Sequence, residues 1–309
     1  MSSLHQDNLY IFEIHEFRSN FVIIKCSQEN NDLSTFRNRS CTMHPAINIA
    51  KRAALNAGRT LMRHYERLDR LTVSIKRPND FVSDADIQAE QEIISTLRKI
   101  YPHYAILAEE SGTTSGTKGE YQWIIDPLDG TTNFLHGFPH FAVSIALQTR
   151  GRLEAAVIYD PIRQEMFTAS RGDGAYLNDR RIRVTSTTRL TAALLGTGFP
   201  LRYPQHIPAY LNMFGSLFTQ CAELRRAGSA ALDLAYVAAG RLDGFWELGL
   251  GAWDMAAGAL LIQEAGGLVG DFRGGHEYLQ TGNIVTGPPK IFKALLQNLQ
   301  PHLTPDLRH

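Results

Sequence analysis

Residues 123–133 read W-I-I-D-P-L-D-G-T-T-N, and this stretch decides the fold. Its first residues, Trp123–Ile125, are apolar and mostly β-branched, which predicts a short buried strand. The strand is expected to end at Asp126, because Pro127 then withdraws a backbone donor. Gly130 permits a left-handed backbone, and the side-chain oxygens of residues 131–133 suit the first turn of a helix. The stretch therefore predicts a strand, a tight turn and a helix start in immediate succession.

Two carboxylates, Asp126 and Asp129, are predicted to lie on this turn. Like charges this close repel each other unless a cation lies between them. Mg²⁺ and similar hard cations take such oxygen ligands, and the neighbouring helix N-terminus favours a phosphate group. The alternative is an ordinary turn whose carboxylates face water. Taken alone, the stretch leaves both interpretations open.

Two further acidic sites favour the metal interpretation. Glu109 and Glu110 follow the apolar run at residues 105–107, and Asp254 lies far downstream beside another apolar run. Three separated acidic sites, each next to a predicted buried element, are hard to explain as solvated surface. They are typical of carboxylates that converge on a shared cation.

A second motif, G-A-W-D-M-A-A-G at residues 251–258, accompanies the central stretch. Together the two resemble the paired signature of the inositol monophosphatase family. The resemblance runs from Met43 to about Gln300, which is nearly all of the chain after its first 42 residues. In detail, G-S-A-A-L-D-L-A-Y-V-A-A-G-R (228–241) and T-G-N-I-V (281–285) are most similar to bacterial members of the SuhB type. Two long motifs in the right order and at the right distance form a specific signal.

The predicted elements indicate a mixed fold. Consecutive antiparallel strands between residues 141 and 177 favour an α+β sheet, whereas the chain after Thr187 alternates strands with helices. The resemblance implies a layered αβαβα sandwich of the inositol monophosphatase and fructose-1,6-bisphosphatase type. We expect an α+β metal-binding domain at residues 43–186, and an α/β domain at residues 187–309 that completes the active site.

Residues 1–42 differ from the rest of the chain. They carry two short apolar runs in a polar background, without the basic start and longer apolar core of a secretory signal. We expect a non-native or disordered extension, with Met43 as the true initiator, because the resemblance begins there. The alternative is a functional arm.

Composition excludes several classes of protein. Of the 309 residues, 44% are hydrophobic and 20% are charged, which is ample for a large core. The formal net charge is +0, so no overall field draws the protein to nucleic acid or to a membrane. No apolar run approaches the ~20 residues that a membrane-spanning helix needs. The cysteines, Cys26, Cys41 and Cys221, are odd in number and lack metal-ligand spacing, which predicts reduced thiols in a cytoplasm.

The resemblance implies roles for individual residues. Two or three Mg²⁺ ions would be bound by Glu109, Asp126, the Leu128 carbonyl, Asp129 and Asp254. The catalytic residues would be Glu109, Thr131 and Asp86, with the Thr131 hydroxyl paired to Glu109 or Asp86. The substrate would contact Asp129, Gly130, Thr131, Gly228, Ser229, Ala230, Glu247 and Asp254.

Three of these residues also have ordinary structural explanations. Asp86 stands at a predicted helix start, where it would serve as an N-cap, and Ser229 has the same alternative. A lone glutamate at a strand end, such as Glu247, is usually on the surface.

The implied activity is Mg²⁺-dependent hydrolysis of inositol monophosphate, a small phosphorylated polyol, to inositol and phosphate by direct attack of metal-activated water. No enzyme-bound phosphate is expected, because Cys221 lacks a nucleophile motif. Fructose bisphosphate, adenosine bisphosphate and NADP are alternative substrates, because their phosphatases share the metal motif. Members of the family are typically lithium-sensitive dimers.

A binding role is the alternative from another class. SuhB-type members are associated with the transcription machinery and ribosomal RNA synthesis, so a contact with RNA polymerase in antitermination is a second candidate function. Candidate surfaces are Arg225–Arg226, Arg180–Arg181 and Arg183, although small basic clusters are usually solvated.

Overall fold

Strand β5 (Tyr121–Asp129) carries the signature stretch and lies inside the larger of the two main sheets. The structure, a computed structural model, describes residues 44–77, 80–117 and 120–308. The expected N-terminal extension, residues 1–42, lies outside the described residues.

The larger sheet has eight strands within the described residues, in the order β10-β9-β8-β7-β6-β5-β3-β4. Neighbouring strands are antiparallel, except that β3 and β5 run parallel. Besides β5, the strands are β3 (Ala105–Ala108), β4 (Gly112–Thr114), β6 (Ala142–Thr149), β7 (Arg152–Asp160), β8 (Glu165–Ser170), β9 (Gly174–Leu177) and β10 (Arg180–Ile182). The run of antiparallel strands that the sequence predicts is confirmed.

Side chains of this sheet alternate between two hydrophobic cores. In β5, Trp123 and Ile125 belong to one cluster of buried residues and Ile124 belongs to another. Met166 and Phe167 on β8 divide in the same way. A strand that is buried on both faces reads as a continuous apolar run, which explains why residues 123–125 show no polar alternation.

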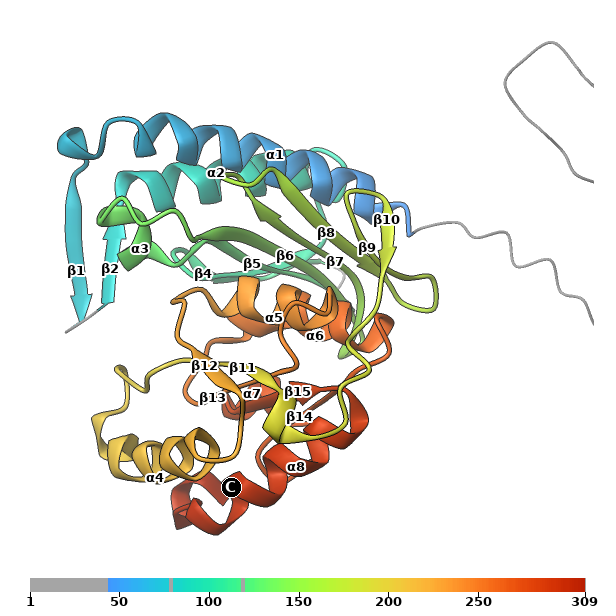
Figure 1. The fold of residues 1–309 in the computed structure, drawn as a ribbon. Helices are drawn as coiled ribbons and strands as arrows, with labels where there is room; N and C mark the ends of the chain where they lie inside the picture. The colour runs from blue at the N-terminus through green and yellow to red at the C-terminus, as the bar shows by residue number, and fades with distance from the viewer. Residues whose placement is uncertain (1–43, 78–79, 118–119, 309) are drawn as a thin grey trace, which may run out of the picture. The chain divides into compact units, whose positions relative to one another are not determined.

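Two pairs of helices cover the faces of the sheet. Helices α1 (Ala46–Tyr65) and α2 (Asp84–Arg98) pack on one face, and α5 (Ala230–Ala238) and α6 (Ala252–Glu264) pack on the other (Figure 1). Small residues bring α5 and α6 close together. A Cβ added at Gly258 would lie 2.4 Å from the Cβ of Leu234 on the neighbouring helix.

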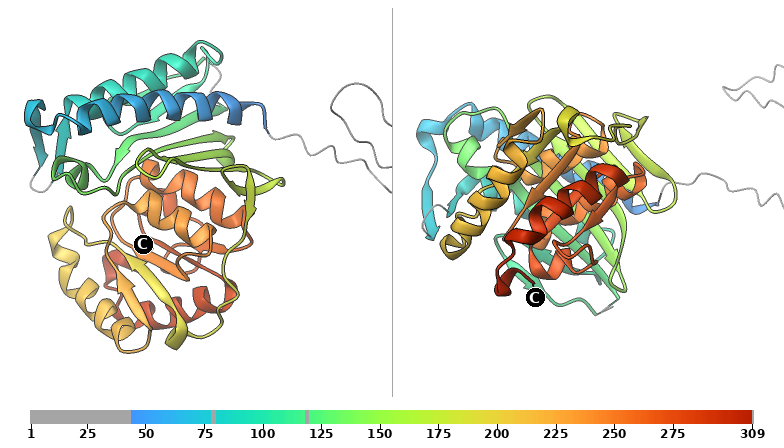
Figure 2. Two further views of the ribbon diagram at one scale, coloured as in Figure 1. Left: turned by 45° about the horizontal axis from the view of Figure 1, so that its top comes forward. Right: turned by 60° about the horizontal axis from the view of Figure 1, so that its bottom comes forward.

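A second sheet lies on the far side of α5 and α6. Its order is β12-β11-β13-β15-β14, and its strands are β11 (Leu194–Thr197), β12 (Glu223–Arg225), β13 (Gly244–Glu247), β14 (Leu268–Gly270) and β15 (Ile284–Gly287). Helices α4 (Ile207–Phe218) and α8 (Pro289–Leu299) share a third buried cluster with this sheet and close the stack (Figure 2). The expected αβαβα sandwich is confirmed, whereas the domain boundary at residues 186/187, between β10 and β11, stays a prediction.

The remaining elements are short. Strands β1 (Val73–Arg77) and β2 (Asp80–Ser83) form an antiparallel pair, and α3 (Thr131–Leu135) and α7 (Tyr278–Thr281) are single turns or little more. Within the described ranges, every helix is too short or too polar to cross a bilayer.

Some predicted boundaries were wrong. Strand β5 continues through Pro127 to Asp129, because its pairing with β6 shifts register after Asp126, and such a bulge tolerates a missing donor. The sequence predicts a helix that begins at Ile87, whereas α2 begins at Asp84, because Ser83 caps it. The sequence predicts a helix over Met255–Ala265 with Asp254 at its start, whereas α6 begins at Ala252 and has Asp254 as its third residue.

Candidate active site

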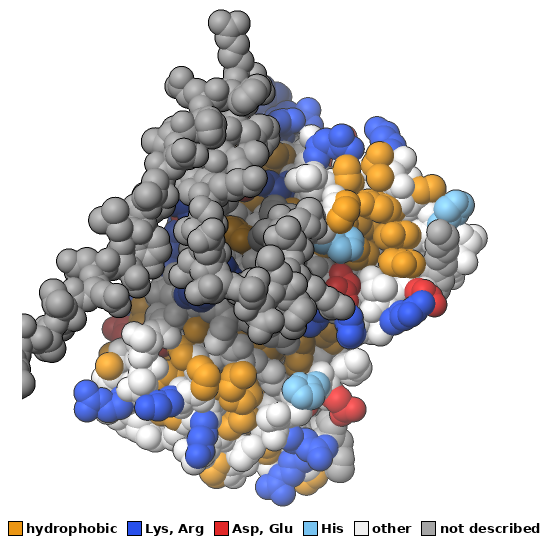
Figure 3. All heavy atoms as spheres, turned by 90° about the vertical axis from the view of Figure 1, so that its right-hand side faces the viewer, with side chains coloured by type: hydrophobic (Ala, Val, Ile, Leu, Met, Phe, Trp, Pro, Cys, Tyr) orange, Lys and Arg blue, Asp and Glu red, His pale blue; other side chains and the backbone are white. Residues whose placement is uncertain are grey.

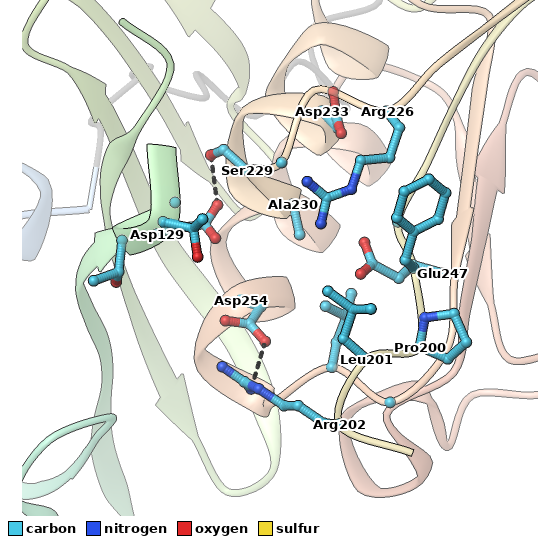
Figure 4. A pocket seen from close by; sticks show the side chains of 18 of the residues that line it. Asp129, Pro200, Leu201, Arg202, Arg226, Ser229, Ala230, Asp233, Glu247 and Asp254 are labelled. Atoms are coloured by element: carbon cyan, nitrogen blue, oxygen red, sulfur yellow. Dashed lines mark hydrogen bonds and ion pairs between the residues drawn. The ribbon is translucent and has the colours of Figure 1, made fainter. Parts of the chain in front are cut away.

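A pocket of about 320 Å³ gathers the predicted site residues. It lies where the C-terminal end of β5 faces the N-termini of α5 and α6, and residues 197–203 form another part of its wall (Figure 4). All the residues expected to bind metal or substrate line this pocket, whereas Asp86 lies behind its wall.

The bulge in β5 determines how Asp126 and Asp129 enter the pocket. Asp126 Oδ1 accepts a hydrogen bond of 2.9 Å from the Leu128 N–H, which holds that carboxylate against its own turn. Gly130 follows with φ +99°, and a Cβ there would lie 3.0 Å from the His140 carbonyl oxygen. Glycine is therefore required at the point where the strand turns into α3.

Asp254 reaches the same place from the other side of the pocket. It is the third residue of α6, and its carboxylate accepts a hydrogen bond of 2.7 Å from the Gly251 N–H. One carboxylate oxygen from each of Asp126, Asp129 and Asp254 lies within 4.8 Å of the others. Asp254 thus joins two aspartates that lie 125 and 128 positions before it in the sequence, and the three form one acidic cluster.

Glu109 adds a fourth carboxylate at the end of β3, where its charge acts on Asp126. The backbone beside it is held by the buried Glu90 of α2. The Glu90 carboxylate accepts hydrogen bonds of 2.9 Å from both the Glu110 and the Ser111 N–H groups. Sequence reasoning missed Glu90, because a glutamate inside a helix resembles any solvated one.

This cluster is electrostatically unfavourable without a cation. Burial raises the pKa of Asp126 well above its usual range, and the charges of Glu109, Asp129 and Asp254 raise it further. Burial and the charge of Asp254 raise the pKa of Asp129 to about 7, against hydrogen bonds that lower it. Carboxylate oxygens suit a hard divalent cation, and neither cysteine nor histidine occurs among the described residues of the lining. The donor set therefore fits magnesium.

A hydroxyl group links this cluster to Asp86. The Thr131 Oγ1 lies 3.1 Å from Asp86 Oδ1 and 3.1 Å from the Leu128 carbonyl oxygen. The hydroxyl has one proton, so it can donate a hydrogen bond to either of these two acceptors. Asp86 Oδ2 accepts hydrogen bonds from the Ser83 N–H (2.8 Å) and hydroxyl (2.6 Å). Ser83 is the N-cap of α2, so the interpretation of Asp86 as the N-cap was wrong. Of the two partners expected for Thr131, the structure places Asp86 at hydrogen-bond distance.

The N-terminus of α5 forms the opposite wall. Ser229 is its N-cap, and the Ser229 hydroxyl also donates a hydrogen bond of 2.6 Å to Asp129 Oδ2. The Ala231 N–H donates to the same oxygen at 2.6 Å. The same Ser229 side chain therefore caps α5 and holds Asp129 in the site. Gly228 precedes it with φ +91°, close to the side chain of Asn133.

Glu247 stands at the end of β13 and is not a surface residue. Burial, then the charges of Asp254, Asp233 and Asp129, raises the pKa of its carboxyl group well above the usual range. A Cβ added at Gly198 would lie 1.9 Å from this carboxylate, so the backbone packs directly on it.

Three charged residues of the pocket were missed or misplaced by the sequence. Arg226, a candidate for a basic surface, is exposed and also lines the pocket, with its guanidinium carbon 4.9 Å from the centre of the Phe199 ring. Asp233 is buried on α5, which raises the pKa of its carboxyl group. Arg202 lies at the mouth, with guanidinium nitrogens 3.5 Å from Glu109 Oε1 and 4.0 Å from Asp254 Oδ2. Asp233 lies inside the stretch at residues 228–241 that carries the resemblance, whereas no local motif marks Arg202 or Arg226, because only the tertiary fold brings their segments to the site.

Known proteins match this chain over most of its length. The model of the inositol monophosphatase family matches residues 42–304. The Nus factor SuhB of Pseudomonas aeruginosa is 60% identical over 270 residues, which cover 86% of this chain and 100% of that protein. The extragenic suppressor protein SuhB of Bartonella henselae has a similar structure, with a TM-score of 0.82 at 46% identity over 84% of this chain and 100% of its own. The inositol monophosphatase of Anabaena gives a TM-score of 0.73 at 38% identity over 83% and 95%.

Proposed function

This chain belongs to the inositol monophosphatase family, and we propose that its acidic pocket hydrolyses inositol monophosphate with the help of Mg²⁺. The observation that carries the proposal is the convergence of Asp126, Asp129 and Asp254, whose carboxylate oxygens lie within 4.8 Å of one another. Such a cluster is costly to fold unless a cation is bound there, which supports a magnesium site.

Glu109, Asp126, Asp129 and Asp254 would hold two or three magnesium ions, together with the Leu128 carbonyl oxygen. Bound magnesium neutralises the charge of the phosphate group and lowers the pKa of the attacking water. Thr131 would position that water, because its hydroxyl can donate a hydrogen bond to Asp86 and accept one from the water. The N–H groups at Gly130 and Thr131 would bind the phosphate oxygens.

The opposite wall supports a polyol as the group that carries the phosphate. Ser229 and Glu247 offer oxygen atoms and Ala230 lies between them on the pocket lining, where hydroxyl groups of the substrate would bind. A buried carboxylate such as Glu247 is costly unless hydroxyl donors reach it, which favours a polyhydroxylated substrate over a plain alkyl phosphate.

A panel of phosphate monoesters tests this proposal. We expect inositol 1-phosphate to be cleaved faster than fructose bisphosphate, adenosine bisphosphate or NADP, and only with Mg²⁺ present. Lithium is expected to inhibit the reaction. Equal rates in EDTA would contradict the magnesium site, whereas a faster rate with another ester would change the substrate and leave the site in place.

A second candidate function is suggested by the relatives that are named Nus factor SuhB. We propose that this chain also contacts the transcription machinery, as a homodimer in the cytoplasm. Exposed Arg180 and Arg181 on β10, with Arg183 nearby, are candidate contacts. Figure 3 shows Lys and Arg side chains at several places on the part of one face that the structure describes.

Genetic complementation separates the two functions. A deletion strain should be complemented by a variant without metal-dependent turnover if binding is the physiological task. Complementation by the active protein alone would make hydrolysis the physiological task.

A further inference from the structure

Arg202 forms a bridge between two acidic residues of the pocket. Its two terminal nitrogens lie 3.5 Å from Glu109 Oε1 and 4.0 Å from Asp254 Oδ2. Figure 4 shows the guanidinium approaching Asp254 from the loop that leads to α4. The arginine side chain is 37% exposed, whereas those of Glu109 and Asp254 are only 11% and 7% exposed. The Arg202 guanidinium therefore reaches in from the solvent side and contacts two carboxylates that are mostly buried.

The loop that carries Arg202 is anchored on both sides of it. At Gly198 the backbone packs on the Glu247 carboxylate, where an added Cβ would lie 1.9 Å away. At Tyr203 the ring packs on Gly249, where an added Cβ would lie 2.4 Å from it. These contacts fix the loop across the pocket mouth and aim the intervening arginine at the acidic cluster.

Glu109 and Asp254 come from opposite walls, at the end of β3 and in the first turn of α6. A divalent cation that binds either carboxylate would lie close to the guanidinium that now faces that carboxylate. Because the guanidinium and the metal ion repel each other at such close range, one contact weakens as the other forms.

We propose that Arg202 competes with divalent cations for Glu109 and Asp254, and so sets the cation concentration at which the site fills. The ion pairs stabilise the acidic pocket before metal binds, and they open when it does. This inference rests on the proposed function, because it requires the pocket to bind a divalent cation.

Direct binding of Mn²⁺ to the metal-free protein, measured by the electron paramagnetic resonance of free Mn²⁺, tests the inference without any turnover. Arg202→Gln removes the charge and keeps most of the side chain. We expect it to lower the Kd for Mn²⁺ about fivefold, which corresponds to about 1 kcal/mol. Arg202→Lys keeps the positive charge but loses the planar guanidinium group. Its Kd for Mn²⁺ should therefore lie between those of the wild type and Arg202→Gln.

Arg152→Gln is the matched control, because it removes the same charge at a distance. Arg152 is an exposed residue that pairs with Glu154, at the end of the β6–β7 hairpin opposite to the pocket. We expect its Kd for Mn²⁺ to equal that of the wild type. If the Kd for Mn²⁺ also fell fivefold in Arg152→Gln, the effect would come from the overall charge of the protein, which would overturn the inference.

A melting curve in EDTA provides the second measurement. Arg202→Gln should melt at a lower temperature than wild type without metal, and should gain more from added Mn²⁺. An unchanged or weaker affinity in Arg202→Gln, with wild type binding Mn²⁺, would overturn the inference alone. If the wild type binds no Mn²⁺ at all, the proposed function fails and the inference fails with it.

Discussion

The hydroxyl of Ser229 donates a hydrogen bond of 2.6 Å to Oδ2 of Asp129, although the two residues are 100 positions apart in the chain. Asp129 ends strand β5 of the larger sheet, and Ser229 caps helix α5, which lies between the two sheets. The carboxylate that we expect to bind magnesium is therefore oriented from the opposite wall. The geometry of the site depends on the packing of α5 against the sheet.

Asp129→Asn is expected to abolish turnover while the fold stays intact. The amide oxygen can still accept from the Ser229 hydroxyl and the Ala231 N–H, so the contact between the walls is kept. The negative charge at the metal site is lost, which should cost several kcal/mol in the transition state. Turnover at saturating Mg²⁺ and the melting temperature together measure this. More than about a tenth of the wild-type rate would count against a multi-metal site.

Thr131→Val is expected to lower kcat about 100-fold, because the side chain can no longer hold a water molecule next to Asp86. The affinity for Mn²⁺ should stay within about twofold of wild type, since the carboxylates remain. Thr131→Ser should restore most of the rate. Thr219→Val, at an exposed threonine after α4, is the control. A kcat of Thr131→Val near that of the control would rule out a role for this hydroxyl.

Gly198→Ala is expected to raise KM for the phosphate ester about tenfold and to change kcat much less. The new methyl group would lie 1.9 Å from the Glu247 carboxylate, which must move away from the polyol side of the pocket. Gly215→Ala on α4 is the matched control, because a Cβ there meets nothing within 4 Å. It should leave KM unchanged and stabilise the helix by roughly 0.5–1 kcal/mol. Equal KM values in the two variants would exclude Glu247 from substrate binding.

The stability of the metal-free protein is expected to fall as pH rises through 7. The pKa of Asp129 is about 7 in the folded protein, against ~3.9 in an unfolded chain. Between these values the folded state holds more protons than the unfolded state. The stabilisation is therefore full below pH ~4 and is lost as pH passes the folded pKa. The shifts of Asp126, Asp233 and Glu247 have the same sign.

Melting temperatures in EDTA between pH 6.5 and 8.5 measure this loss. His140 has the opposite sign: burial and Arg163 lower its pKa to about 4, so its stabilisation is present above the unfolded pKa of ~6.5 and is lost as pH falls through the folded value. Saturating Mg²⁺ should make the melting temperature nearly independent of pH. In EDTA, Asp129→Asn should show a smaller decrease in melting temperature with pH than the wild type. A flat curve for the metal-free wild type would contradict the raised pKa values.

Much of the fold follows from local patterns in the sequence. The sequence predicts a strand at residues 244–247 and a closing helix at residues 289–299, and strand β13 (Gly244–Glu247) and helix α8 (Pro289–Leu299) have these bounds. Strand β10 (Arg180–Ile182) was missed, because its basic residues pair at a sheet edge that has no local signal. The end of β5 was misplaced, because the bulge that accommodates Pro127 depends on pairing with β6.

The sequence by itself determined the family, the layered fold and the acidic residues of the candidate site. The family and the layered fold follow from the resemblance that the two motifs carry, and local residue types, such as Asp126 and Asp129 on one turn, mark the acidic residues. Only the tertiary structure decided that Thr131 faces Asp86, that Glu90 holds the backbone beside Glu109, and that Arg202 and Arg226 lie in the pocket. Such contacts join segments many residues apart, and their geometry depends on how sheets and helices pack.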